Sequence, residues 1–227
     1  MRIRVLGSSA GGGFPQWNCN CPNCNGLRRG TLKARARTQS SIAVSDNGQD
    51  WLLVNASPDI LTQIRDNPEL QPARAIRDSG IAAVLLMDAQ IDHVTGLLML
   101  RERKTPLPLL ATPEVFSDIG SGFPITGILS HYCGTERQEL PIDGRAVHIE
   151  ALPGLKLHTV SLSSKPPPYS PFRGNPRPGD NIGLLITNPS TGTRAFYAPG
   201  LAEVTDDLIE LMSGCAVVLV DGTFWTH

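Results

Sequence analysis

The stretch Leu85–His93 reads LLMDAQIDH and decides the fold, because an apolar β-strand ends there abruptly in polar side chains. From Val94 onward the apolar residues have helical spacing. Functional residues of α/β proteins often lie at such carboxyl ends of strands. Asp92 and His93 could offer a carboxylate oxygen and an imidazole nitrogen to one metal ion. The spacing fits equally well a helix N-cap by Asp92 beside a hydrogen-bonded histidine.

Short apolar runs bounded by turn residues recur on both sides of this stretch and predict a series of β-strands. Apolar residues at helical spacing predict helices at Pro58–Asp66, Val94–Glu102 and Val204–Met212. This alternation predicts an α/β fold with layered sheets, formed by a single domain over residues 1–227. The predicted strands are Ile3–Leu6, Ser41–Val44, Trp51–Val54, Ala82–Met87, Leu107–Ala111, Val147–Leu152, Lys156–Leu162, Asn181–Thr187, Arg194–Ala198 and Ala216–Val220.

The composition, with 41% hydrophobic and 18% charged residues over 227 positions, is that of an ordinary soluble protein with one sizeable core. Twenty basic and twenty-one acidic residues nearly cancel, so we expect no nucleic acid and no membrane as partner and favour a small molecule. The first ten residues lack the features of a signal peptide, and no apolar run reaches the ~18 residues of a membrane span. We therefore expect a cytoplasmic protein.

Three of the five cysteines, Cys19, Cys21 and Cys24, lie within six residues. This crowding suits a metal ion better than a set of disulfides. Three soft thiolates predict a structural zinc site, provided that a fourth ligand comes from elsewhere. The alternative is three structural thiols that bind no metal.

A second apolar strand, Ala216–Val220, also ends in a carboxylate, that of Asp221. A functional group at the tip of this strand is one interpretation. An Asp-Gly pair such as Asp221 and Gly222 is also common in ordinary turns, and the sequence favours neither interpretation.

The stretch Lys165–Asp180 contains six prolines and cannot continue a helix or a central strand. It predicts a long ordered loop near a ligand site. Tyr169 and Phe172 favour packing of this loop against the rest of the molecule. A flexible interdomain linker is the alternative.

These features, in this order, resemble the metallo-β-lactamase superfamily, in which a strand ends in His-x-His-x-Asp-His and later strand ends add metal ligands. The segment Asp88–His93 lies in the register of that motif. Within the superfamily, the chain resembles the proteins of pyrroloquinoline quinone (PQQ) biosynthesis over its whole length. The segments that carry this closer resemblance are Leu6–Cys19, Arg37–Ser41, Asn55–Asp59, Tyr197–Gly200 and Asp221–Thr223.

The resemblance implies a metallo-β-lactamase-like αββα sandwich that lacks its C-terminal part in this chain. Proteins of the family continue beyond the position of His227 with segments that supply further metal ligands. His227 itself is therefore a poor candidate ligand.

The departures from the hydrolase motif are informative. Asp88 and Gln90 stand in place of its first two histidines, Ser163 or Ser164 in place of a later one, and Pro199 in place of the bridging aspartate. The similarity to hydrolases therefore does not extend to a dinuclear zinc site.

Asp92 and His93 remain from the motif, and one more histidine would complete the ligand set of non-haem Fe(II) oxygenases. The resemblance thus implies a hydroxylase that uses iron and oxygen on the tyrosine ring of a glutamate–tyrosine-derived PQQ precursor. Asp92 and His93 would hold the iron and Asp221 would orient water or substrate. Substrate contacts are predicted for Arg37, Gln39, Ser40, Ser57 and Asp180.

A carrier for PQQ or its precursor is the main alternative, and it needs no redox metal and turns nothing over. A metal-dependent hydrolase, the weaker alternative, needs a metal-activated water but consumes no oxygen. Besides the small-molecule precursor, other proteins of the pathway and a second copy of the chain, forming a homodimer, are candidate partners.

Overall fold

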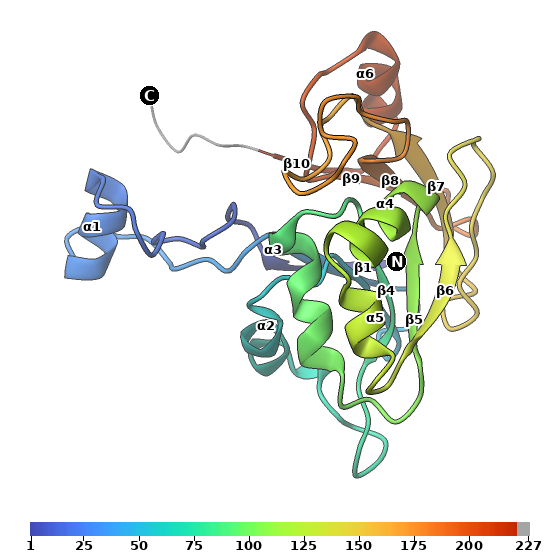
Figure 1. Cartoon of the computed structure of the whole chain (residues 1–227), viewed down its shortest axis with the longest axis horizontal. Helices are drawn as coiled ribbons and strands as arrows, with labels where there is room; N and C mark the ends of the chain where they lie inside the picture. Colours follow the sequence, from blue (N-terminus) through green and yellow to red (C-terminus); the bar gives the residue numbers. More distant parts are fainter. Residues whose placement is uncertain (222–227) are drawn as a thin grey trace.

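Two stacked β-sheets form the centre of the molecule in the computed structural model, which describes residues 1–221 (Figure 1). The six strands of the first sheet follow one another in sequence order: β1 (Arg2–Gly7), β2 (Ser41–Ser45), β3 (Trp51–Val54), β4 (Ile81–Leu85), β5 (Leu107–Ala111) and β6 (Thr135–Glu139). The four strands of the second sheet have the order β10 (Val217–Val220), β9 (Arg194–Ala198), β8 (Ile182–Thr187) and β7 (Lys156–Ser161).

Helices cover the outer face of each sheet, so the predicted αββα sandwich is confirmed. Within residues 1–221, the helix that packs against the second sheet is α6 (Asp206–Ser213), which contributes Leu208 to the contact. The helices beside the first sheet are α2 (Ile60–Asp66), η1 (Pro68–Leu70), α3 (Ile91–Val94), η2 (Thr95–Leu100), α4 (Pro113–Ser117), η3 (Asp118–Gly122) and α5 (Ile125–Leu129). Within residues 1–221 no helix has the length and apolar character needed to cross a membrane.

Alternating side chains of the strands divide the core into two layers. In β2, Ile42 and Val44 belong to the cluster between the sheets, whereas Ala43 belongs to the cluster under the helices. Because both faces of this strand are covered, all five of its residues are buried. The same alternation in β4 directs Leu85 toward the second sheet and Val84 toward the helices.

Two predicted elements differ in the structure. Val147–Leu152 is not a strand, because only Val147 pairs, in a single bridge with Leu157, and the backbone then turns at Leu152. Its apolar side chains still enter the core between the sheets, so the alternation of apolar residues misled the prediction. The predicted helix Val94–Glu102 begins earlier, at Ile91, as one α-helical turn and continues as the 3-10 helix η2.

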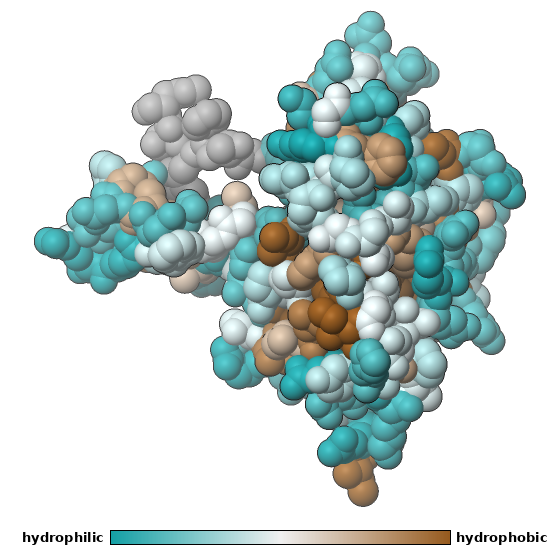
Figure 2. Space-filling model, in the orientation of Figure 1, coloured by the Kyte–Doolittle hydropathy of each residue, from teal (hydrophilic) through white to brown (hydrophobic). Residues whose placement is uncertain are grey.

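A hydrophilic arm projects from the body and carries helix α1 (Pro22–Arg29) at its tip (Figures 1 and 2). Cys21 caps the N-terminus of α1, and Gly30, with φ of 71°, ends it in the left-handed conformation. The sequence analysis did not predict this helix, because it is short and buries only Cys24 and Gly26.

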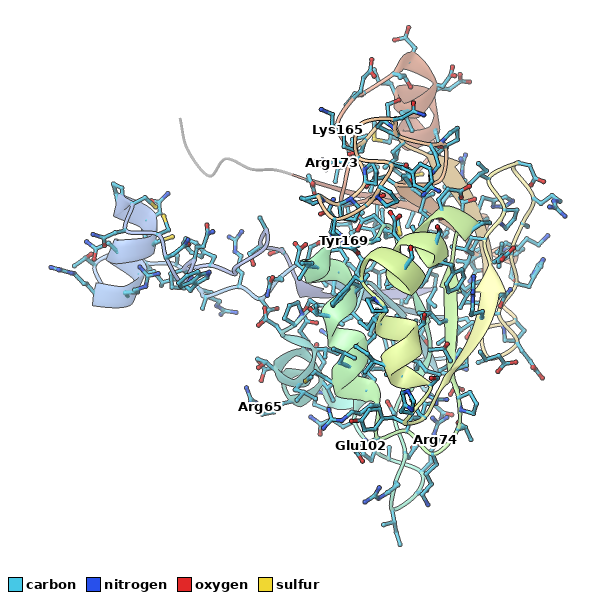
Figure 3. All side chains as sticks on the ribbon, viewed as in Figure 1. Arg65, Arg74, Glu102, Lys165, Tyr169 and Arg173 are labelled. Atoms are coloured by element: carbon cyan, nitrogen blue, oxygen red, sulfur yellow. The ribbon has the colours of Figure 1, made fainter. Side chains whose placement is uncertain are left out.

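The proline-rich stretch Lys165–Asp180 is a packed loop and contains no helix or strand. Tyr169 points from it toward the helical layer (Figure 3), where its hydroxyl donates a hydrogen bond to the carbonyl oxygen of Ala89. The Arg177 guanidinium lies 3.6 Å from the centre of the Phe172 ring. The prediction of an ordered loop is therefore confirmed, and the linker interpretation is not.

Candidate active site

A cavity of about 420 Å³ opens between the ends of the two sheets. One wall comes from the loop after β1 and from the turn that follows β4; the other comes from the ends of β9 and β10. The lining includes Ser8, Ser9, Ser40, Asp88, Gln90, Asp92, His93, Ser164, Asn181, Tyr197, Pro199 and Asp221.

His93 is fixed in this cavity by a buried carboxylate. Its Nδ1 lies 2.7 Å from Oδ1 of Asp88, which also accepts a hydrogen bond of 2.8 Å from the backbone N–H of Gln90. A carboxylate at Nδ1 favours the tautomer that leaves Nε2 free for a metal ion, as in carboxylate–histidine–metal triads. Burial alone would lower the pKa of His93, but the Asp88 carboxylate, together with those of Asp92 and Asp221, outweighs it and raises that pKa to about 9 in the metal-free chain.

Asp92 and Asp221 complete an acidic cluster around this histidine. Oδ2 of Asp92 faces Gly11, where an added Cβ would lie only 3.2 Å from that oxygen. The pKa of Asp221 is raised to about 6, mainly by burial; His93 opposes this rise, and the Asp88 and Asp92 carboxylates add to it. The structure thus brings the three predicted catalytic residues to one cavity: Asp92 and His93 are neighbours in α3, and Asp221 follows β10.

The chemistry of the cavity suits a cation. Among its described lining residues there are three aspartates and one histidine, and no lysine or arginine. Carboxylate oxygens and an imidazole nitrogen are ligands that iron and zinc both accept. The second histidine of the predicted iron site is not among the lining residues within 1–221, and His227 lies outside the described part of the chain.

A separate candidate metal site lies on the arm. The sulfur atoms of Cys19, Cys21 and Cys24 lie within 4.8 Å of one another. The backbone N–H groups of Cys21, Cys24 and Gln16 point at these three sulfur atoms in turn, at distances of 3.4 to 3.5 Å. Such contacts stabilise thiolates, so the geometry suits the predicted structural zinc. No fourth histidine, cysteine or acidic ligand joins this group within residues 1–221.

The pKa values of the thiols shift in different directions within this cluster. Hydrogen bonds from the backbone of Cys24 and from the Cys19 side chain lower the pKa of Cys21 to about 7. The backbone N–H of Gln16 also lowers the pKa of Cys24, but burial and the neighbouring sulfurs raise it by more. A bound cation would relieve that repulsion between sulfur atoms.

Of the predicted substrate contacts, only Ser40 lines the cavity. Its hydroxyl lies 2.9 Å from the hydroxyl of Tyr197, which reaches the cavity from β9. Arg37 lies at the base of the arm, where its backbone pairs with that of Phe14 in both directions.

Gln39, Ser57 and Asp180 are not among the cavity-lining residues, and their polar groups stabilise neighbouring backbone. Gln39 accepts a hydrogen bond from Gly12 and donates one to Asp59, which links the glycine loop to the start of α2. The Ser57 hydroxyl accepts one from the N–H of Asp59. These contacts favour structural roles.

Asp180 takes part in a buried ionic network at the end of the proline-rich loop. Its carboxylate lies 2.7 Å from the Arg177 guanidinium, which also lies 3.7 Å from the Asp118 carboxylate. Ser170 donates a hydrogen bond of 2.9 Å to Asp118. The network attaches the loop to the helical layer, and this explains the burial of Asp180 without a ligand.

Three lining residues that the sequence analysis did not propose as functional are Asp88, Asn181 and Tyr197. Asp88 follows the buried strand β4 and precedes His93 by five positions, and that spacing was the available signal. Asn181 and Tyr197 lie next to strand ends of the second sheet, and only the stacking of the sheets brings them to the cavity.

Comparison with known proteins agrees with this architecture. Residues 50–227 match the family model described as the beta-lactamase superfamily domain. Coenzyme PQQ synthesis protein B of Cupriavidus necator is 62% identical over 223 residues, which cover 98% of this chain and 73% of that protein. This chain belongs to the family of coenzyme PQQ synthesis protein B.

Two solved structures have folds similar to that of this chain. The Zn(2+)-bound PqqB of Methylobacterium extorquens has a TM-score of 0.85 and 38% identity, with 98% of this chain and 73% of that chain covered. A diphosphatase of the PhnP family has a TM-score of 0.67 at 17% identity, with 95% and 72% covered, and shares the fold. The function of this chain therefore lies in PQQ biosynthesis.

Proposed function

We propose that this member of the PQQ synthesis protein B family hydroxylates the tyrosine-derived ring of a glutamate–tyrosine precursor, using iron and dioxygen. The observation that carries the proposal is the acidic cavity around a single histidine whose Nδ1 is occupied by Asp88. This arrangement suits one metal ion with open coordination positions, as oxygen chemistry requires.

Asp92 and His93 would hold the iron. When bound, Fe(II) supplies the activation of dioxygen that ring hydroxylation needs. Asp88 would keep the Nε2 lone pair of His93 directed at the ion. A carboxylate partner of this kind commonly contributes 10–100-fold to metal affinity or activity.

Asp221 would hold or move a proton beside the ring. In the metal-free chain its pKa is raised to about 6, mainly by burial, which brings its protonation change toward neutral pH. A group with such a pKa can accept the proton of a phenol or return one to it. Each hydroxylation replaces a ring C–H by C–OH, consumes one O₂ and two reducing equivalents from an external reductant, and releases the second oxygen atom as water.

The hydrolase alternative has little support in this cavity. The dinuclear hydrolases need further ligands where this chain has Gln90, Ser164 and Pro199, all of which line the cavity. A carrier of PQQ or its precursor has one supporting observation, namely the incomplete iron ligand set within residues 1–221.

Single-turnover mass spectrometry tests the proposal. The chain, extended to the length of its relatives and loaded anaerobically with Fe(II), is mixed with the crosslinked glutamate–tyrosine substrate before ¹⁸O₂ is admitted. We expect ¹⁸O in the ring, and loss of incorporation in Asp92→Ala and His93→Ala, whereas His148→Ala, which alters an exposed histidine, retains it. Tight substrate binding without oxygen uptake would instead support the carrier.

A further inference from the structure

The cysteine cluster on the arm has a second chemical pattern besides its metal-ligand geometry. Cys21 and Cys24 are separated by two residues and occupy the N-cap and the third position of helix α1. The sulfur of Cys21 accepts a hydrogen bond of 3.5 Å from the backbone N–H of Cys24. A Cys-x-x-Cys pair at a helix N-terminus favours thiol–disulfide exchange, because the positive end of the helix stabilises a thiolate.

The sulfur atoms of Cys21 and Cys24 are close enough to form a bond after rotation of their side chains. They lie within 4.8 Å of each other, in one group with the sulfur of Cys19. Side chains three positions apart at the start of a helix are neighbours, so the bond requires no movement of another element. Cys133 and Cys215 lie outside this group.

The two thiols differ in their access to solvent. Cys21 is exposed, whereas Cys24 is buried and only 5% exposed. An oxidant in solution therefore reaches Cys21 first, and Cys24 reacts with a sulfur that is already beside it. This difference suits Cys21 to the role of attacking thiol and Cys24 to that of resolving thiol.

Cys19 is less suited than Cys24 to bond with Cys21. Its residue lies in the loop before α1, where the Arg28 guanidinium donates hydrogen bonds to the carbonyl oxygens of Cys19 and Gln16. These contacts hold the backbone of the loop against the helix. A bond from Cys21 to Cys24 leaves both contacts intact, because the two residues belong to the helix start itself.

We propose that Cys21 and Cys24 form a reversible disulfide, and that the arm is therefore a thiol–disulfide exchange site. The Cys21 thiolate attacks a small-molecule disulfide, forms a mixed disulfide and releases one thiolate. Cys24 then loses its proton, attacks the sulfur of Cys21 and releases the second thiolate. In all, two cysteine thiols lose two electrons and two protons, and the incoming disulfide becomes two thiols.

The disulfide and a metal ion compete for the same sulfur atoms. Oxidation of Cys21 and Cys24 leaves Cys19 as the one remaining thiolate of the group, which is too few to hold zinc. Conversely, an ion bound to the three sulfurs withholds the Cys21 thiolate from an oxidant. The arm thus binds metal under reducing conditions and releases it under oxidising conditions.

Trapping of the thiols in glutathione buffers tests the proposal. The metal-free chain is equilibrated with reduced and oxidised glutathione, denatured with an alkylating reagent and digested for mass spectrometry. We expect a Cys21–Cys24 peptide that has lost two hydrogen atoms, with Cys133 and Cys215 alkylated, and reversal by dithiothreitol. Zn²⁺ added before glutathione should prevent the bond. A Cys21 that stays reduced, a bond to Cys19 instead, or a bond that forms equally with Zn²⁺ present would overturn the proposal.

Two double variants test the roles of the two thiols. Cys19→Ser/Cys24→Ser keeps Cys21 alone in the cluster, and Cys19→Ser/Cys21→Ser keeps Cys24 alone. In native buffer the first variant should take up glutathione at least several-fold faster, because its thiol is exposed. In urea the difference should vanish.

Equal rates in native buffer would refute the assigned roles, and circular dichroism checks that both variants fold. The wild-type experiment decides the proposal even if a variant does not fold. Neither experiment involves iron or the cavity, so failure here is independent of the hydroxylase proposal.

Discussion

The imidazole Nδ1 of His93 lies 2.7 Å from a carboxylate oxygen of Asp88, and both side chains are buried. The resemblance to the superfamily motif places Asp88 where the hydrolases have a metal-binding histidine. In this chain the Asp88 carboxylate instead holds the imidazole of His93 in place.

Asp88→Asn should therefore weaken metal binding in the cavity about 10–100-fold, because the neutral amide polarises the imidazole less than a carboxylate does. Anaerobic Fe(II) titration of the cavity site measures the effect. Asp143→Asn, which alters an exposed aspartate, serves as the control. Unchanged affinity in Asp88→Asn would contradict the positioning role of Asp88.

The same pair predicts a pH dependence of stability in the metal-free chain. The pKa of His93 is raised to about 9 from an ordinary 6.5, so the protonated imidazole stabilises the fold. The contribution is on the order of 3 kcal/mol, fully present below pH 6.5 and lost as pH rises through 9. Urea unfolding at several pH values should show this loss in the wild type. A His93→Asn chain with the same loss would refute it.

The cysteine cluster on the arm should bind one zinc or cobalt ion through thiolates. Cobalt loading should give the intense near-ultraviolet absorption of sulfur-to-metal charge transfer, and Cys21→Ser should abolish or strongly reduce it. Cys133→Ser and Cys215→Ser, which alter cysteines outside the cluster, should leave it unchanged. An equal signal in Cys21→Ser would show that the ion is held elsewhere.

Arg177→Ala should lower the free energy of unfolding by about 3 kcal/mol, because it leaves the buried carboxylates of Asp118 and Asp180 without their cation. Urea denaturation measures the loss. Arg145→Ala removes an exposed ion pair and should change stability little. If both variants unfold alike, the network is not what holds the proline-rich loop.

Gly96 is required by the close approach of two backbone segments. A Cβ at this position would lie 2.2 Å from the carbonyl oxygen of Ser57, so Gly96→Ala should cost about 3 kcal/mol or prevent folding. Gly127 in α5 has open space around it, and Gly127→Ala should stabilise the chain by about 0.5–1 kcal/mol. Thermal unfolding should show a lower midpoint temperature for Gly96→Ala and a higher one for Gly127→Ala than for the wild type.

The strands of the sandwich were predictable because burial on both faces leaves continuous apolar runs, as in Trp51–Val54. Strand β6 was missed for the opposite reason: its sequence TERQE is polar and all of its residues are at least partly exposed at the sheet edge. The opposite error was made for Val147–Leu152, which was predicted to be a strand. Its apolar side chains alternate and are buried, but its backbone makes only one isolated bridge.

The candidate site was predictable only in part. Asp92, His93 and Asp221 follow predicted strands, and this position can be recognised from the sequence alone. The hydroxyl groups of Ser40 and Tyr197 are in contact although the two residues are 157 positions apart. Nothing in the sequence around either residue indicates that they meet. Gln39 and Asp180 had the polarity of binding residues, but burial and local partners explain them.

The cavity is built from residues 5–42, 88–93 and 164–221, so no contiguous segment contains it. A ligand bound in the cavity would contact both sheets at once. Its binding would therefore stabilise the packing of the two sheets against each other. At a hundredfold excess over its dissociation constant, a ligand would add about 2.7 kcal/mol to the free energy of unfolding. Amide hydrogens in both sheets should then exchange more slowly with solvent when the ligand is bound.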